Sequence, residues 1–159
     1  MPSKLPKSTF VAIAAVAWAD GRMSKAEAHG LVHAAQAMGL EGADLAAVEQ
    51  ATKEKVSIDA FDPAGLTDWE KLVTYGLAHW LSRLDGVQQG AELDSLRALH
   101  GKLASGDVTD YKLRSAAAIA FDVAMQPEGR RPDRFDFAAL EAQIAERFPT
   151  VTRLSSLPE

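Results

Sequence analysis

The segment Ala19-Asp20-Gly21-Arg22-Met23-Ser24-Lys25-Ala26-Glu27 has a counterpart sixty-five residues later, Leu84-Asp85-Gly86-Val87-Gln88-Gln89-Gly90-Ala91-Glu92. Both copies contain Asp-Gly, five further residues and then Glu. Each follows an apolar run typical of a helix and precedes a second such run. Residues of the same type coincide at this offset, where Asp20, Gly21, Ala26, Glu27 and Leu31 fall on Asp85, Gly86, Ala91, Glu92 and Leu96. The chain is therefore expected to contain two related helical hairpins, each closed by an Asp-Gly turn.

Helix capping explains part of this repeat. Gly21 can supply the left-handed residue that ends a helix, and Ser24 with Glu27 has the sequence of a capping box. In the second copy Gln89 is a poor N-cap, although Glu92 keeps its place. Two interpretations stay open: the carboxylates only cap helices, or they also bind a ligand.

A metal ion is the ligand that the four carboxylates favour. Asp20, Glu27, Asp85 and Glu92 converge if the hairpins pack about a pseudo-twofold axis that brings both turns to the same end of the bundle. Carboxylate oxygens suit Ca²⁺, Mg²⁺ or Mn²⁺ better than Zn²⁺. The turn is not an EF-hand loop, because Arg22 occupies the third place, where that loop needs an oxygen ligand. The sequence thus predicts a divalent-metal site of modest affinity.

Composition predicts one soluble globular domain of 159 residues. The absence of cysteine excludes disulfides and thiolate metal sites and fits a reducing, cytoplasmic location. A net charge of −5 argues against a nucleic-acid partner, and the basic cluster Arg130, Arg131 and Arg134 is too small to change this. The apolar run 10–19 is too short for a transmembrane segment. Cleavage after it would separate the first Asp-Gly turn from its helix, so we interpret the run as a buried helix and not a signal peptide.

Helical periodicity and capping signals predict seven helices, and no segment shows the alternation typical of a strand. The expected helices are 10–19, 24–38, 42–55, 67–84, 89–104, 109–125 and 135–148. Thr9 or Ser8 is expected to cap the first helix, Gly39 to end the second and Thr109 to cap the sixth, while Thr67-Asp68-Trp69-Glu70 has the sequence of a capping box. The prediction is an all-α, single-domain bundle over residues 1–148, followed by a C-terminal tail, 149–159.

The histidines and one aspartate are the remaining candidates. His29 and His33 have the spacing of a metal pair, but a solvated helix face explains them better, and His79 is expected to be half-buried. Asp122 interrupts an apolar run, so we expect it to be partly buried and paired with Arg130, Arg131 or Arg134. An enzyme would need Asp122 or His79 in a deep pocket, and no nucleophile motif or phosphate-binding glycine loop is present.

The stretch Ala-Val-Ala-Trp-Ala-Asp20-Gly21, five residues, Glu27 and Ala-His-Gly-Leu-Val, with the second Asp85-Gly86 and Glu92, resembles the TerB-like family, named after tellurite resistance protein B. The resemblance covers about residues 8–104. It implies an all-helical, non-enzymatic protein of two related hairpins, whose acidic turns are proposed to bind metal through residues at the places of Asp20, Glu27, Asp85 and Glu92. It also implies tellurite or other stress responses and a protein partner, often in membrane-associated complexes.

The leading hypothesis is therefore a non-enzymatic, cytoplasmic TerB-like domain with a metal-binding acidic end, acting in stress response or as a docking module. The alternative is a metal-free protein–protein interaction module, in which the carboxylates only cap helices and exposed apolar residues of the third or seventh helix recruit a partner. An enzyme is the third hypothesis.

Overall fold

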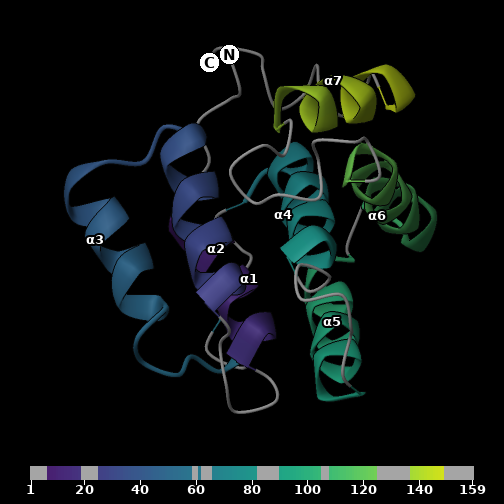
Figure 1. The fold of residues 1–159 in the computed structure, drawn as a ribbon. Coiled ribbons are helices and arrows are strands. Elements are labelled where there is room, and N and C mark those ends of the chain that lie inside the picture. The colour runs from purple at the N-terminus through teal and green to yellow at the C-terminus, as the bar shows by residue number, and fades with distance from the viewer. Residues whose placement is uncertain are drawn as a thin grey trace.

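A computed structural model of the chain has an all-α fold, as predicted (Figure 1). The structure describes residues 7–18, 25–58, 61, 66–81, 90–104, 108–124 and 137–148. Within these ranges there are seven helices and no strand. The helices are α1 (Lys7–Ala17), α2 (Lys25–Ala37), α3 (Gly42–Ala51), α4 (Asp68–Leu81), α5 (Gly90–Leu103), α6 (Asp110–Ala124) and α7 (Phe137–Arg147).

Helices α1 and α4 form the centre of the fold. Almost all residues of α1 after Ser8 are buried, and so is the run 72–78 of α4. A helix that is apolar around its whole circumference needs neighbours on every side. Helix α1 contacts α2, α3, α4 and α5, while α4 contacts α5, α6 and α7 as well. Figure 1 shows α2 and α3 on one side of this pair and α5 and α6 on the other.

The length of α1 bears on the predicted absence of a transmembrane segment. Its 11 residues rise about 16 Å at 1.5 Å per residue, roughly half of the thickness of a bilayer core. Within the described ranges, no helix combines the length and the apolar character that a membrane span requires. The apolar run is a helix packed inside the bundle, as the sequence predicts.

Two buried threonines join the central helices. Thr9 Oγ1 and Thr74 Oγ1 lie 2.9 Å apart, and both residues are 0% exposed. Thr74 Oγ1 also donates to the Glu70 carbonyl oxygen at 2.6 Å. A hydroxyl has one hydrogen, so Thr9 is the donor between the helices. The prediction that Thr9 or Ser8 caps the first helix is wrong, because α1 begins at Lys7 and includes both residues.

The same two threonines are separated by sixty-five residues, the offset of the acidic repeat. Other positions related by this offset occupy similar environments: Leu31 and Leu96 are both buried, as are Met38 and Leu103. The Thr9–Thr74 contact therefore joins equivalent positions of the two copies of the repeat.

Local capping signals predict the helix ends well. The Thr67 backbone N–H donates to Glu70 Oε1 at 2.9 Å, and the Glu70 N–H donates to Thr67 Oγ1 at 3.1 Å, which confirms the capping box. Thr109 caps α6 through the Lys112 N–H at 3.2 Å. Gly39, with a φ of 92°, follows α2 as expected. Helix α3 ends earlier than predicted, with Thr52 as its C-cap.

The threonine contact predicts strong energetic coupling between α1 and α4. We expect Thr74→Val to lower the free energy of unfolding by about 1–3 kcal/mol, because it removes the acceptor of the buried Thr9 hydroxyl, and Thr9→Val to cost less, about 0.5–1.5 kcal/mol, because Thr74 keeps its hydrogen bond to the Glu70 carbonyl. The double variant removes both hydroxyls and should cost clearly less than the sum of the two single changes. Urea denaturation of the four proteins measures this cycle. Additive effects would show that the two hydroxyls do not interact.

Helices α4 and α6 approach closely at Gly76. A Cβ at this position would lie 3.2 Å from the Ala116 carbonyl oxygen and 3.6 Å from the Ala120 Cβ. The first distance is to rigid backbone, so a large side chain has no room without separating the helices. Gly101, by contrast, lies on the exposed side of α5, and a Cβ added there would have no neighbour within 4 Å.

These two glycines provide a matched pair of substitutions. Gly76→Leu should lower the free energy of unfolding by about 1–3 kcal/mol or more, since it overpacks the α4–α6 contact. Gly101→Ala should raise it by about 0.5–1 kcal/mol, because alanine is the better helix former and meets no neighbour. Chemical denaturation compares both with the parent protein. A neutral Gly76→Leu would contradict the close approach of the two helices.

Candidate functional site

Glu27 is the predicted metal ligand whose side chain the structure describes. It lies in the first turn of α2 and is 3% exposed. Asp20 and Asp85 lie outside the described residues. Glu92 belongs to α5, but its side chain is also outside the described part. Among the described side chains, no group of three or more His, Asp or Glu residues is arranged to hold a metal ion. Three of the four predicted ligands are not among these side chains.

Burial gives the Glu27 carboxylate an unusual position. A carboxylate withdrawn from water needs charges or hydrogen bonds that replace its hydration. The first turn of α2 supplies part of this, because the N-terminus of a helix carries a partial positive charge. The sequence places Glu27 at the border of the apolar stripe of α2, and the structure places it inside the bundle.

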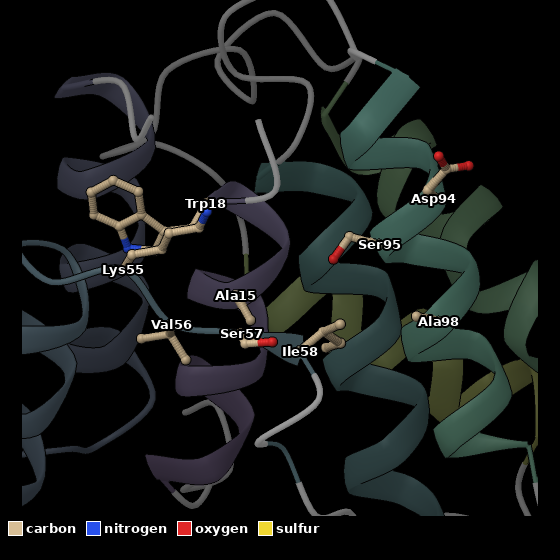
Figure 2. A pocket seen from close by; sticks show the side chains of 9 residues that line it. All are labelled: Ala15, Trp18, Lys55, Val56, Ser57, Ile58, Asp94, Ser95 and Ala98. Carbon is tan, nitrogen blue, oxygen red and sulfur yellow. The ribbon is translucent and has the colours of Figure 1, made fainter. Parts of the chain in front are cut away.

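A pocket of about 430 Å³ lies between the end of α1 and the first turns of α5 (Figure 2). Trp18 is the last described residue before the first acidic segment, and Asp94 and Ser95 lie in the second turn of α5, two and three residues after Glu92. These residues share the pocket wall with Ala15, Lys55, Val56, Ser57, Ile58 and Ala98. The end of α1 and the second turn of α5 therefore border one pocket.

The polar groups of this pocket differ in orientation. The Trp18 Nε1–H donates to the Ala51 carbonyl oxygen at 2.7 Å, which fixes the indole against the end of α3. Figure 2 shows the Ser95 hydroxyl pointing toward the middle of the pocket and the Asp94 carboxylate pointing away from it. Ser95 is buried, whereas Asp94 is exposed and pairs with Arg97 at 3.4 Å.

Sequence reasoning did not find this pocket. A signal was present at Ser95, which precedes Leu96 and lies four residues before Leu99 on the buried side of α5. A polar residue on the buried side of an amphipathic helix indicates either a hydrogen bond in the core or a pocket. Residues 55–58 also line the pocket but belong to no α-helix, so helical periodicity could not predict their position.

Two of the histidine predictions are confirmed. His29 is exposed as expected for a solvated helix face, whereas His33 is half-buried, and the two rings are stacked with their centroids 6.4 Å apart. His79 is half-buried as expected, and the Tyr75 ring meets it edge-on at a centroid distance of 4.6 Å.

The prediction for Asp122 is wrong, because the residue is exposed. Alanine tolerates solvent, so the apolar run around Asp122 includes the outer side of α6 as well as its buried side. The suggested partners Arg130, Arg131 and Arg134 lie outside the described residues. Asp122 and His79 instead line a hollow of about 340 Å³ together with Ala117, Ala118 and Phe121. Its described wall offers one carboxylate and one imidazole on an otherwise apolar surface.

The exposed apolar residues also differ from the prediction. Within the described ranges, the large ones are Leu93 of α5 and Tyr111 and Phe121 of α6, with 39%, 58% and 41% of their surface exposed. The sequence suggested helices three and seven instead.

A polar cluster connects α5 to α6. His100 Nε2 lies 2.7 Å from Asp110 Oδ1, and Arg114 Nε lies 3.1 Å from Asp110 Oδ2. The Tyr75 ring packs edge-on against His100. Burial raises the pKa of the Tyr75 hydroxyl above 10.0, the nearby Asp110 carboxylate raises this pKa further, and Arg114 partly opposes both effects.

This pKa shift predicts a loss of stability in alkaline solution. The folded protein holds the Tyr75 proton more tightly than the unfolded chain, so the stabilisation is complete below pH of about 10 and falls as pH rises through the higher folded pKa. Tyr75→Phe should remove this part of the pH dependence. Urea midpoints of both proteins from about pH 8 to pH 11 measure it. Parallel curves would contradict the shift.

Comparison with known proteins gives no relative: no protein-family model, curated protein or solved structure matches the chain. The resemblance to the TerB-like family therefore depends on the acidic repeat in the sequence alone.

Proposed function

We propose that this protein is a non-enzymatic, TerB-like helical domain whose acidic end binds a divalent cation through Asp20, Glu27, Asp85 and Glu92. It acts in a cytoplasmic stress response, such as that to tellurite, or in the assembly of a multiprotein complex. The observation that carries the proposal is the burial of the Glu27 carboxylate in the first turn of α2. A carboxylate that only caps a helix in solvent has no need to leave water.

The pocket between α1 and α5 supports a shared site. Trp18 precedes the first turn and Ser95 follows the second, and both line this pocket. The Thr9–Thr74 hydrogen bond joins the two copies of the repeat at equivalent positions. Metal–oxygen bonds are only about 2.0–2.6 Å long, so one ion requires the turns to approach closely. Carboxylate ligands favour Ca²⁺, Mg²⁺ or Mn²⁺ over Zn²⁺.

Calorimetric titration of the metal-stripped protein with these four ions tests the proposal. We expect saturable binding that the double variant Asp20→Asn, Asp85→Asn loses. Glu27→Gln, which keeps the shape of the side chain and removes its charge, should weaken binding roughly tenfold or more. Metal at about 100 times its Kd should also raise the free energy of unfolding by about 2.7 kcal/mol, as measured by denaturation with and without the ion.

Glu41→Gln is the matched control. Glu41 precedes α3, is exposed and makes no side-chain cap hydrogen bond, so its replacement should leave both metal binding and stability unchanged. Two outcomes would show that the acidic residues only cap helices. These are no binding at millimolar metal and equal binding by the Asp20→Asn, Asp85→Asn variant. The metal-free interaction module would then be the better hypothesis, with Tyr111 and Phe121 as its exposed apolar residues.

A further inference from the structure

The outer face of α6 consists of Tyr111, Arg114, Ser115, Ala118, Phe121 and Asp122. At 100° per residue, these residues lie within about 60° of Ala118 around the helix. All are exposed except Ser115, which is half-exposed. The opposite side of α6, with Leu113, Ala116 and Ala120, packs against α4 at Gly76. Tyr111 contacts Arg147 of α7 and Phe148, which follows this helix, so the part of the face that these two residues leave exposed runs from Arg114 to Asp122.

The charges and side-chain sizes on this face are complementary about Ala118. Arg114 and Asp122 lie four residues before and after it, and Ser115 and Phe121 lie three residues before and after it. One side of the centre thus carries a cation and a small residue, while the other carries an anion and a large aromatic ring. In an antiparallel copy of α6 centred on the same alanine, Asp122 lies at the height of Arg114 along the helix axis, and Phe121 lies at the height of Ser115.

We infer that the outer face of α6 binds a second copy of this chain, in an antiparallel α6–α6 contact with a twofold axis at Ala118. Such an isologous interface repeats each contact twice. The small side chain of Ala118 allows the two helices to come within the 8–10 Å typical of packed helices. Arg114 of each copy then lies at the level of Phe121 and Asp122 of the other, about 6 Å along the axis from the centre.

The hollow beside α6 fits this occupant. Its wall combines the Asp122 carboxylate, the Phe121 ring and small alanine side chains, with His79 of α4 on the other side. A guanidinium group can pair with a carboxylate while it stacks on an aromatic ring. Arg114 already pairs with Asp110 on its own helix, but both groups are mostly exposed, and such surface pairs contribute little. Arg114 is therefore available to the second copy.

Sedimentation equilibrium of the full-length protein from about 10 μM to about 1 mM tests this inference. The contact involves one helix face, so we expect a weak dimer whose average mass rises across this range. Ala118→Arg places two like charges on the axis and should leave a monomer. Ala46→Arg, the same change at an exposed alanine of α3, is the matched control and should leave the dimer unchanged.

Charge reversal tests the pairing itself. Arg114→Asp alone places two carboxylates opposite each other, and Asp122→Arg alone places two guanidinium groups opposite each other. Each single variant should therefore dimerise about tenfold more weakly or worse. An equimolar mixture of these two variants restores opposite charges at both sites and should recover dimers. Helical circular dichroism confirms that each variant is folded.

Three results would overturn the inference: a parent protein that stays monomeric at about 1 mM, an Ala118→Arg variant that still dimerises, or folded charge variants whose mixture associates no better than either one alone. Metal has no part in the contact, so these outcomes are independent of the proposed metal site.

Discussion

The hydrogen bond between Thr9 and Thr74 fixes the register of the two central helices. It lies in an interface that is otherwise apolar, and both hydroxyls are fully buried. Sliding α1 along α4 by one helical turn, about 5.4 Å, would leave both groups without this contact in the core. Apolar side chains alone tolerate such shifts better, because their attraction has little direction. One polar contact therefore selects a single arrangement of the two hairpins.

The rest of the bundle follows from that register. Helix α4 carries Thr74 on the side facing α1 and, two residues later, Gly76 on the side where α6 approaches. Helix α1 holds α3 through the Trp18 hydrogen bond to Ala51. With α1 and α5 in contact, the end of one helix and the start of the other border the same pocket. Contacts between helices at some distance from the pocket therefore position the residues that line it.

Prediction from the sequence succeeds where the cause is local. The capping box at Thr67 and Glu70, the cap at Thr109 and the stop at Gly39 involve residues within one turn of each other. It fails where a residue far away in the sequence determines the contacts of a side chain. Thr9 has the sequence context of a cap, but its hydroxyl bonds to α4. Asp122 and Leu93 lie on apolar-looking helices whose periodicity shows which residues share a face, but not which face lacks a neighbour. Thr9 and Thr74 coincide at the sixty-five-residue offset, but the same residue type at both positions does not by itself predict a contact.

The acidic residues show a different limit of sequence reasoning. A helix cap and an ion ligand both require a carboxylate near the start of a helix, so the repeat by itself cannot separate them. Burial adds an observation that the repeat does not contain, because an exposed cap keeps most of its hydration whereas Glu27 is withdrawn from water. That withdrawal has to be compensated within the protein. In the proposed site, a cation bound by both acidic segments would compensate several carboxylates at once, and it would give Glu92 a role in a copy whose cap position holds Gln89.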